Sequence, residues 1–289
     1  MTRFLLLLTT ASAAFAQTPA PKSKTANDYV AQLVATLTPT RKIVYKKVAD
    51  RELSLHVFQP DGWKVGDKRA CYITIHGGGW TGMGPERMFS FADHFAKLGL
   101  VSFSVEYRLV KAKENVTVFD CVKDVRSAVR YVRAHATELG IDPNKIIVSG
   151  GSAGGHLAAA TAMFDVNEDS DDLKISPTPN ALVLLFPVID TSTDGYGNTR
   201  IGERWKELSP AHNVRPGLPP TITFHGTADP TTPFKGAQAF HDAMLKAGNR
   251  SELVVNQGGQ HGYLMRTQPL YDECMEKTDA FLKSLKLLP

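Results

Sequence analysis

From residue 70 onward, the sequence alternates between short apolar runs and longer segments with helical spacing. The apolar runs have the length of strands and few polar residues, which is typical of strands that are buried on both faces. Strands that alternate with helices favour a mostly parallel sheet covered by helices on both sides. The apolar runs lie at residues 70–75, 100–108, 145–150, 181–188, 221–226 and 251–257, and the helical segments at 87–99, 116–139, 153–164, 233–248 and 268–287.

Two earlier segments, residues 41–50 and 53–60, alternate apolar and polar residues and predict an antiparallel edge of the same sheet. We therefore expect an α/β fold over residues 41–289. The connection at about residues 187–212 is unusually long for a compact domain, and such connections are often functional. We interpret it as a lid-like insertion or substrate wall with a short helix over residues 202–208.

The first residues have the pattern of a secretory signal. Arg3 precedes a short apolar run, and Ala14-Phe15-Ala16 provides the small residues that signal peptidase recognises. We expect a signal peptide over residues 1–16, cleavage near Ala16–Gln17 and an exported protein without a membrane anchor, since no later run approaches ~20 apolar residues. Residues 17–40 are expected to form a linker and a short helix at about 26–37.

Charge and cysteine content exclude several functions. The net charge is only +4 and no basic stripe is present, so nucleic acid is not an expected partner. Arg126, Arg130 and Arg133 share one face of the helix at 116–139 and are expected to be solvated. The cysteines are odd in number and lack metal-ligand spacing. They are Cys71, Cys121 and Cys274, which we interpret as buried thiols, with one disulfide left open.

The sequence Gly150-Gly151-Ser152-Ala153-Gly154 matches G-x-S-x-G between a predicted strand and a predicted helix. In this setting the motif predicts a sharp turn that exposes the serine at the sheet edge. Glycine at the flanking positions avoids a collision with neighbouring backbone. A purely structural glycine-rich turn is the alternative.

A serine hydroxyl needs a base to become a nucleophile. Asp229 follows the strand at 221–226, and His261 follows the last strand at 251–257. Because these strands are expected to be parallel, all three side chains would meet at one edge of the sheet. Their order in the chain, serine, aspartate and histidine, also matches the motif's usual context. Two earlier carboxylates, Asp190 and Asp194, compete for the role of the acid.

The sequence His76-Gly77-Gly78-Gly79-Trp80 follows the strand at 70–75. Three glycines let backbone N–H groups approach a developing oxyanion. We expect the donors to be Gly78, Gly79 and Ala153. A phosphate-binding loop is the alternative, but the lysine and serine or threonine of a P-loop are absent. No second ligand stands at a fixed spacing from His76, so we expect no metal and assign His76 to holding the loop.

Together, "HGGGW", "VEYRL" and "GGSAGGHLAA" resemble the α/β-hydrolase superfamily, and within it the hormone-sensitive-lipase-like and bacterial feruloyl- and acetyl-xylan-esterase-like serine esterases. The resemblance covers about residues 45–285. Many lipase-like relatives have an acidic residue where this chain has Gly151, which favours the carbohydrate-esterase-like branch.

This resemblance implies a Ser-His-Asp carboxylesterase that needs no cofactor and acts on short-chain acyl or feruloyl esters, on small molecules or polysaccharide. Trp80 and Trp205 are candidates for a sugar or aryl platform, with packing in the core as the alternative. A prolyl-oligopeptidase-type peptidase and an inactive binding homologue are the competing functions. The usual propeller domain of the former has no room in 289 residues.

Overall fold

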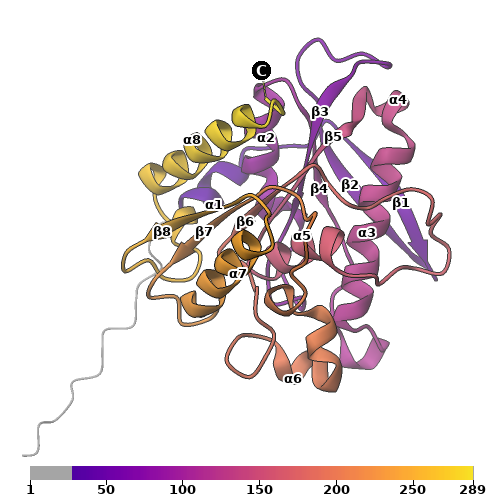
Figure 1. Cartoon of the computed structure of the whole chain (residues 1–289). Coiled ribbons are helices and arrows are strands. Elements are labelled where there is room, and N and C mark those ends of the chain that lie inside the picture. The colour runs from indigo at the N-terminus through magenta and orange to yellow at the C-terminus, as the bar shows by residue number, and fades with distance from the viewer. Residues whose placement is uncertain (1–27, 289) are drawn as a thin grey trace, which may run out of the picture.

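One mixed sheet forms the centre of the protein. The structure is a computed structural model that describes residues 28–288. The strands of the sheet lie in the order β1-β2-β4-β3-β5-β6-β7-β8, with helices on both sides (Figure 1). The strands are β1 (Arg41–Val48), β2 (Arg51–Phe58), β3 (Arg69–Ile75), β4 (Val101–Val105), β5 (Ile141–Gly151), β6 (Ala181–Leu185), β7 (Thr221–Gly226) and β8 (Ser251–Asn256).

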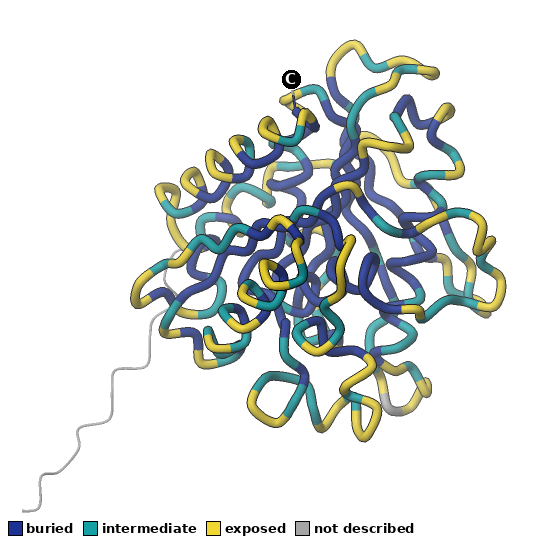
Figure 2. The backbone as a smooth tube through the Cα atoms, in the orientation of Figure 1, coloured by how far each residue is buried: buried dark blue, intermediate teal, exposed yellow. Residues whose placement is uncertain are grey.

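Helices cover the two faces of this sheet. Apolar residues of α3, α5 and α7 pack on one face, and those of α2 and α8 pack on the other. Figure 2 shows the buried sheet inside a shell of partly exposed helices. The helices are α1 (Tyr29–Val34), η1 (Pro85–Met88), α2 (Phe89–Lys97), η2 (Ala112–Glu114), α3 (Val118–Ala134), α4 (Ala136–Leu139), α5 (Ala153–Met163), α6 (Asn198–Ile201), η3 (Gly202–Leu208), η4 (Pro210–His212), α7 (Phe234–Lys246), η5 (Tyr263–Met265) and α8 (Gln268–Ser284).

Strand direction and burial agree with the sequence pattern. The pairs β1–β2 and β2–β4 are antiparallel, and the other pairs are parallel. Every residue of β4, β6 and β7 is buried, as expected for strands covered on both faces. In β1 only Tyr45 is buried, because this strand lies at the edge. The predicted α/β fold with an antiparallel edge is confirmed.

The long helix predicted over residues 116–139 is divided into α3 and α4. The prediction that Arg126 and Arg130 on this helix are solvated is wrong. Arg126 and Arg130 are not solvated, since they are only 5% and 6% exposed. Arg126 donates to backbone carbonyls of α5 at 3.0 and 3.2 Å, and Arg130 forms an ion pair with Asp171 at 2.8 Å. The loop that follows α5 returns over this face of α3, so the two cations have protein partners instead of water.

The long connection at residues 187–212 contains α6, η3 and η4. The short helix predicted over residues 202–208 is present as the 3-10 helix η3. The connection is tied to the sheet through α5, because His156 Nε2 donates to the carbonyl oxygen of Leu208 at 2.7 Å. The part that precedes η3 lies against the cavity described below, where Tyr196 contributes to the wall.

The described chain begins with α1, which lies inside the range predicted for a short helix. Its first turn is capped by Asp28, whose carboxylate accepts a hydrogen bond from the N–H of Ala31 at 3.1 Å. The predicted signal peptide over residues 1–16, its cleavage site and the start of the linker lie outside the described residues. Across residues 28–288, no helix combines the length and the apolar character that a membrane crossing requires.

The three cysteines are buried and unpaired, as predicted. Burial raises the pKa of each thiol, namely those of Cys71, Cys121 and Cys274. A protonated, inaccessible thiol is a poor nucleophile and a poor metal ligand. These residues therefore serve as small apolar side chains in the core.

Candidate active site

Ser152 occupies the sharp turn between β5 and α5. Its φ and ψ angles are 56° and −122°, a region that residues other than glycine rarely adopt. The surrounding contacts hold this conformation, because the Ser152 N–H donates to Leu185 at 2.9 Å and the Ser152 carbonyl accepts from Val188 at 3.0 Å. Strain of this kind is typical of a nucleophile held at the end of a strand.

Two glycines make the turn sterically feasible. A Cβ atom on Gly154 would lie 2.1 Å from the carbonyl oxygen of Ile75, and one on Gly150 would lie 2.2 Å from that of Gly154. Both distances are shorter than any van der Waals contact, so a larger residue would push the turn away from β3. The physical reason that the sequence suggested for these glycines is confirmed.

Ser152, His261 and Asp229 form one chain of hydrogen bonds. Ser152 Oγ lies 2.8 Å from His261 Nε2, and His261 Nδ1 lies 2.8 Å from Asp229 Oδ2. Asp229 comes from the loop after β7 and His261 from the loop after β8. The competing carboxylate Asp190 instead accepts from the N–H of Ser192 at 2.8 Å. The structure thus brings together the three residues that the strand order predicted.

The surroundings of Asp229 keep its carboxylate ionised. Burial alone would raise the pKa, but hydrogen bonds from His261, Thr232 and Thr231 outweigh that effect and lower it. The N–H groups of Thr231 and Thr232 donate to Oδ1 at 2.8 and 2.9 Å. An ionised carboxylate can only accept hydrogen bonds. His261 Nδ1 therefore carries the proton toward Asp229, which leaves Nε2 to accept the proton of Ser152.

The glycine-rich loop after β3 faces Ser152. Gly78 and Gly79 have φ angles of 100° and 60°, and both line the same cavity as Ser152. Neither N–H donates a backbone hydrogen bond within the described part of the chain. Ala153 is the first residue of α5, where the helix has no internal acceptor for its N–H. This arrangement suits the stabilisation of negative charge beside Ser152.

A tyrosine that the sequence analysis did not assign supports this loop. The Tyr107 hydroxyl donates to the carbonyl oxygens of His76 at 2.9 Å and Gly77 at 3.3 Å. The Tyr107 ring also stacks on His76 with 4.3 Å between centroids. His76 Nδ1 lies 2.9 Å from the Gly77 carbonyl oxygen, so the loop-holding role predicted for His76 is confirmed. The signal for Tyr107 was its position directly after β4 in "VEYRL".

The two candidate platform residues, Trp80 and Trp205, differ in burial. Trp80 is 0% exposed, and its ring lies between His156 and Tyr196, with centroid distances of 5.1 and 5.7 Å. Its φ angle of 63° turns the side chain inward beneath the connection. Trp205 packs edge-on against His212 at 5.1 Å, away from the residues that line the cavity. The platform role predicted for Trp80 is therefore wrong, and its role is packing. Trp205 is partly exposed, and its platform role stays a prediction.

A cavity of about 400 Å³ opens above Ser152 and His261. Its apolar wall consists of side chains that the sequence analysis did not single out, namely Met83, Met88, Phe186 and Met265. Asp28, Arg87 and Arg266 add charge at its edge, and Asp28 and Arg87 form an ion pair. Thioether side chains are flexible and accommodate varied apolar groups. The cavity thus offers a small apolar space next to a nucleophile and oxyanion donors.

His76 is almost fully buried. Burial lowers the pKa of this histidine to about 4, so its imidazole is neutral at physiological pH. Among residues 28–288, no group of three or more histidine, cysteine or carboxylate side chains has the arrangement of a metal site.

Two protein-family models match this chain. The model of the BD-FAE family matches residues 55–244, and that of a second family, described as TAP-like protein, matches residues 203–287. The first match includes Ser152, Asp229 and the glycine-rich loop. The second includes His261.

One similar protein of known structure is an esterase. Esterase 2 of Thermogutta terrifontis, solved as the form phosphoramylated by tabun, is 43% identical with a TM-score of 0.82, over 86% of this chain and 95% of that chain. Other structures of that esterase are described as propionate bound and butyrate bound.

Two curated relatives are more distant. Probable carboxylic ester hydrolase LipM of Mycobacterium tuberculosis is 27% identical over 61% of this chain and 45% of its own length. Acetylxylan esterase of Xylanibacter ruminicola is 26% identical over 74% of this chain and 45% of its own length. The chain thus spans about half the length of these curated relatives. By the family match and by the similarity to a solved esterase, the chain belongs to the BD-FAE family of α/β-hydrolase serine esterases.

Proposed function

We propose that the protein hydrolyses short-chain carboxylic esters through an acyl-enzyme, with Ser152 as nucleophile, His261 as general base and Asp229 as its orienting acid. The observation that carries this proposal is the continuous chain of 2.8 Å hydrogen bonds from Ser152 Oγ through the imidazole to Asp229. This arrangement converts a weakly nucleophilic hydroxyl into a reactive one at neutral pH.

The reaction follows from the direction of these hydrogen bonds. Ser152 Oγ attacks the ester carbonyl carbon while His261 Nε2 takes its proton. The N–H groups of Gly78, Gly79 and Ala153 stabilise the oxyanion of the tetrahedral intermediate. His261 then protonates the departing alcohol oxygen. Water attacks the acyl-enzyme with the same proton transfers and releases the carboxylic acid.

The apolar cavity limits the acyl group. A volume of about 400 Å³, part of which the ester group and the leaving alcohol must share, suits a short chain. The propionate and butyrate bound to the Thermogutta terrifontis esterase support the same size class. Acetyl, propionyl and butyryl esters are therefore the proposed substrates in preference to octanoyl esters.

The alcohol part of the substrate is proposed to be a carbohydrate, with acetyl groups as its natural esters. The similarity to an acetylxylan esterase supports this class. Export after cleavage near Ala16–Gln17 would bring the enzyme to such polymers. Determination of the N-terminal residue of the protein recovered from the producing cells tests the export step, and an intact Met1 would contradict it.

A fluorophosphonate probe tests the nucleophile. The reaction of tabun with the Thermogutta terrifontis esterase suggests that phosphorus electrophiles label this family. We expect labelling of the wild-type protein and of the exposed-serine control Ser170→Ala, and none of Ser152→Ala. Labelling of Ser152→Ala at the wild-type rate would refute the assignment.

Hydrolysis of p-nitrophenyl esters tests the acyl preference and the competing functions. Acetyl ester is expected to react faster than octanoyl ester. The opposite order would indicate a lipase. Cleavage of prolyl peptides without ester hydrolysis would indicate a peptidase, and a protein with neither activity nor labelling would be a binding homologue.

A further inference from the structure

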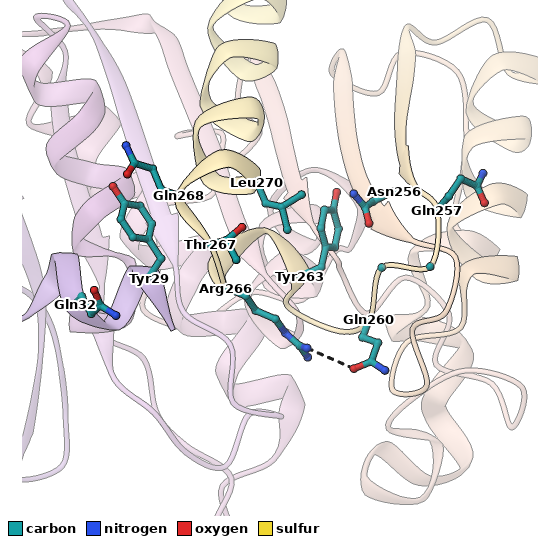
Figure 3. A pocket seen from close by; sticks show the side chains of 12 residues that line it. Tyr29, Gln32, Asn256, Gln257, Gln260, Tyr263, Arg266, Thr267, Gln268 and Leu270 are labelled. Carbon is teal, nitrogen blue, oxygen red and sulfur yellow. Dashed lines mark hydrogen bonds between the residues drawn. The ribbon is translucent and has the colours of Figure 1, made fainter. Parts of the chain in front are cut away.

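Figure 3 shows a second cavity, which is lined in part by the segment that also carries His261. Its volume is about 750 Å³. Residues of this segment line either one cavity or the other. Gln260 and Tyr263 line the second cavity, while His261 and Gly262, which lie between them in the sequence, line the first. Arg266 lines both. The two cavities therefore adjoin along one segment, so an extended ligand could reach from the first into the second.

The lining of this second cavity is rich in side-chain amides. The amide residues are Gln32, Asn256, Gln257, Gln260 and Gln268. An amide offers two donor hydrogens and an acceptor oxygen, and therefore matches adjacent hydroxyl groups, each of which both donates and accepts. Tyr29 and Tyr263 add aromatic faces with polar ends. Such faces can pack against the C–H groups of a sugar ring.

Most of this hydrogen-bonding capacity is not used within the cavity. Among the described side chains drawn in Figure 3, the one hydrogen bond joins Arg266 Nη1 to Gln260 Oε1 at 3.4 Å. Figure 3 also shows that the amides of Gln32 and Gln268 come from different elements, α1 and α8. The Tyr29 N–H donates to the Arg266 carbonyl oxygen at 3.2 Å, which fixes α1 against the His261 loop. The two walls are thus held in place before a ligand arrives.

The charge of this lining narrows the class of ligand. Among the lining residues that the structure describes (within 28–288), Arg266 is the one that carries a charge and none is a carboxylate. An apolar ligand would leave the amides without partners, which is unfavourable. A phosphate-rich ligand would meet a single guanidinium group. A neutral, polyhydroxylated ligand satisfies both the amides and the tyrosines.

We propose that this amide-lined cavity binds a saccharide unit of the alcohol part of the substrate, at a distance from the ester bond that reacts with Ser152. The proposal rests on the esterase function proposed above and goes beyond it by assigning a binding site for the leaving group. It implies that an acetylated oligosaccharide is a better substrate than a simple acetyl ester of the same reactivity. The gain is in KM, because the contacts lie away from the reacting carbonyl.

A double variant, Gln32→Ala/Gln268→Ala, tests the site. Both side chains are exposed, and alanine maintains their helices. The measurement is kcat/KM for acetylated xylotetraose divided by kcat/KM for p-nitrophenyl acetate. We expect this ratio to fall at least tenfold through a higher KM for the oligosaccharide, since each lost hydrogen bond weakens binding by about 1 kcal/mol. The matched control Gln238→Ala, on α7, should leave the ratio unchanged.

Binding without turnover separates this inference from the esterase function. Unacetylated xylotetraose is titrated into Ser152→Ala protein by calorimetry, with and without the Gln32→Ala/Gln268→Ala change. Binding that weakens at least tenfold in the triple variant supports the site, even if no ester is hydrolysed by the wild type. The inference is overturned if the wild-type enzyme is active but the double change alters neither the substrate ratio nor the affinity for xylotetraose. In that case the esterase function still stands.

Discussion

The floor and the rim of the active site differ in how they are built. We define the floor as residues 76–80 and 150–155, and the rim as the side chains of Met83, Met88, Tyr196 and Arg266. The floor is made mainly of backbone and glycine, packed so closely that a single added carbon would overlap its neighbours. The rim is made of side chains, some of them widely exposed, such as Met83 at 62%. The floor determines which reaction is possible, and the rim determines which ester reaches it.

This difference predicts that changes at the floor and at its hydrogen-bonded partners are severe, and that changes at the rim are graded. The largest effect is expected from Asp229→Asn, which keeps the shape but removes the charge that fixes the tautomer of His261. A fall of about 10⁴-fold in kcat is expected by analogy with serine proteases. Steady-state kinetics with p-nitrophenyl acetate measures it. Asp190→Asn is the matched control, and a comparable loss there would move the acid to Asp190.

Trp80 tests whether the floor depends on buried packing. Trp80→Ala should lower the free energy of unfolding by about 3–5 kcal/mol, because it removes a fully buried ring and leaves a cavity. Trp205→Ala, at a partly exposed position, should lower the free energy of unfolding by clearly less than Trp80→Ala. Urea denaturation followed by circular dichroism measures both. If Trp80→Ala and the wild type are equally stable, packing is not the role of Trp80, and a role in ligand binding is favoured instead.

Gly154→Ala tests the steric limit of the turn. Its Cβ would lie 2.1 Å from the Ile75 carbonyl oxygen, so we expect a destabilisation of about 3 kcal/mol together with loss of esterase activity. Gly82→Ala is the control in the neighbouring loop, where an added Cβ has nothing within 4 Å. The melting temperatures of the two variants are compared. A normal melting temperature for Gly154→Ala would show that the turn can move away from β3.

At the rim, Met88→Ala should change selectivity more than rate. The Met88 side chain is 1% exposed and lines the acyl cavity, so its removal enlarges that space. The ratio of kcat/KM for hexanoyl over acetyl p-nitrophenyl ester should rise about tenfold, the scale of one or two methylene groups in a pocket. Leu173→Ala, on an exposed loop, should leave it unchanged. An unaltered ratio in Met88→Ala would place the acyl chain elsewhere.

The smallest effect, a change in the free energy of unfolding, is expected when Glu168 is replaced, because this residue lies outside both the floor and the rim. Burial by itself would raise the pKa of this carboxyl. The positive charges of Lys46, Lys123 and Arg108 lower the pKa by more than burial raises it, so the pKa lies below its ordinary value. The ionised form thus stabilises the fold above the pKa of the unfolded chain. This contribution is lost as pH falls through the lower pKa of the folded state.

Glu168→Gln should therefore lower the free energy of unfolding by at most about 1 kcal/mol at pH 7. The difference from wild type should shrink below about pH 4, near the ordinary glutamate pKa. Denaturation curves at pH 7, 5 and 3.5 measure it. A difference that grows as pH falls would contradict the direction of the pKa shift.

The sequence alone determined the fold class and the three residues at the sheet edge. Apolar runs that alternate with helical segments permit few arrangements other than a covered parallel sheet. Once the strands are parallel, residues that follow them must lie at one edge, so Ser152, Asp229 and His261 could be placed together without coordinates. The glycines around Ser152 were predictable for the same local reason, since a strand that turns directly into a helix leaves no room for side chains.

Only the tertiary structure decided which way individual side chains face and what surrounds them. Trp80 follows the glycine-rich loop in the sequence, but a positive φ angle and the overlying connection turn it into the core. Arg126 and Arg130 have the spacing of a solvated helix face, yet a later loop covers them. The methionines and amides that line the two cavities come from segments far apart in the chain. Local sequence pattern cannot reveal such neighbours, because their contacts depend on how separate elements pack.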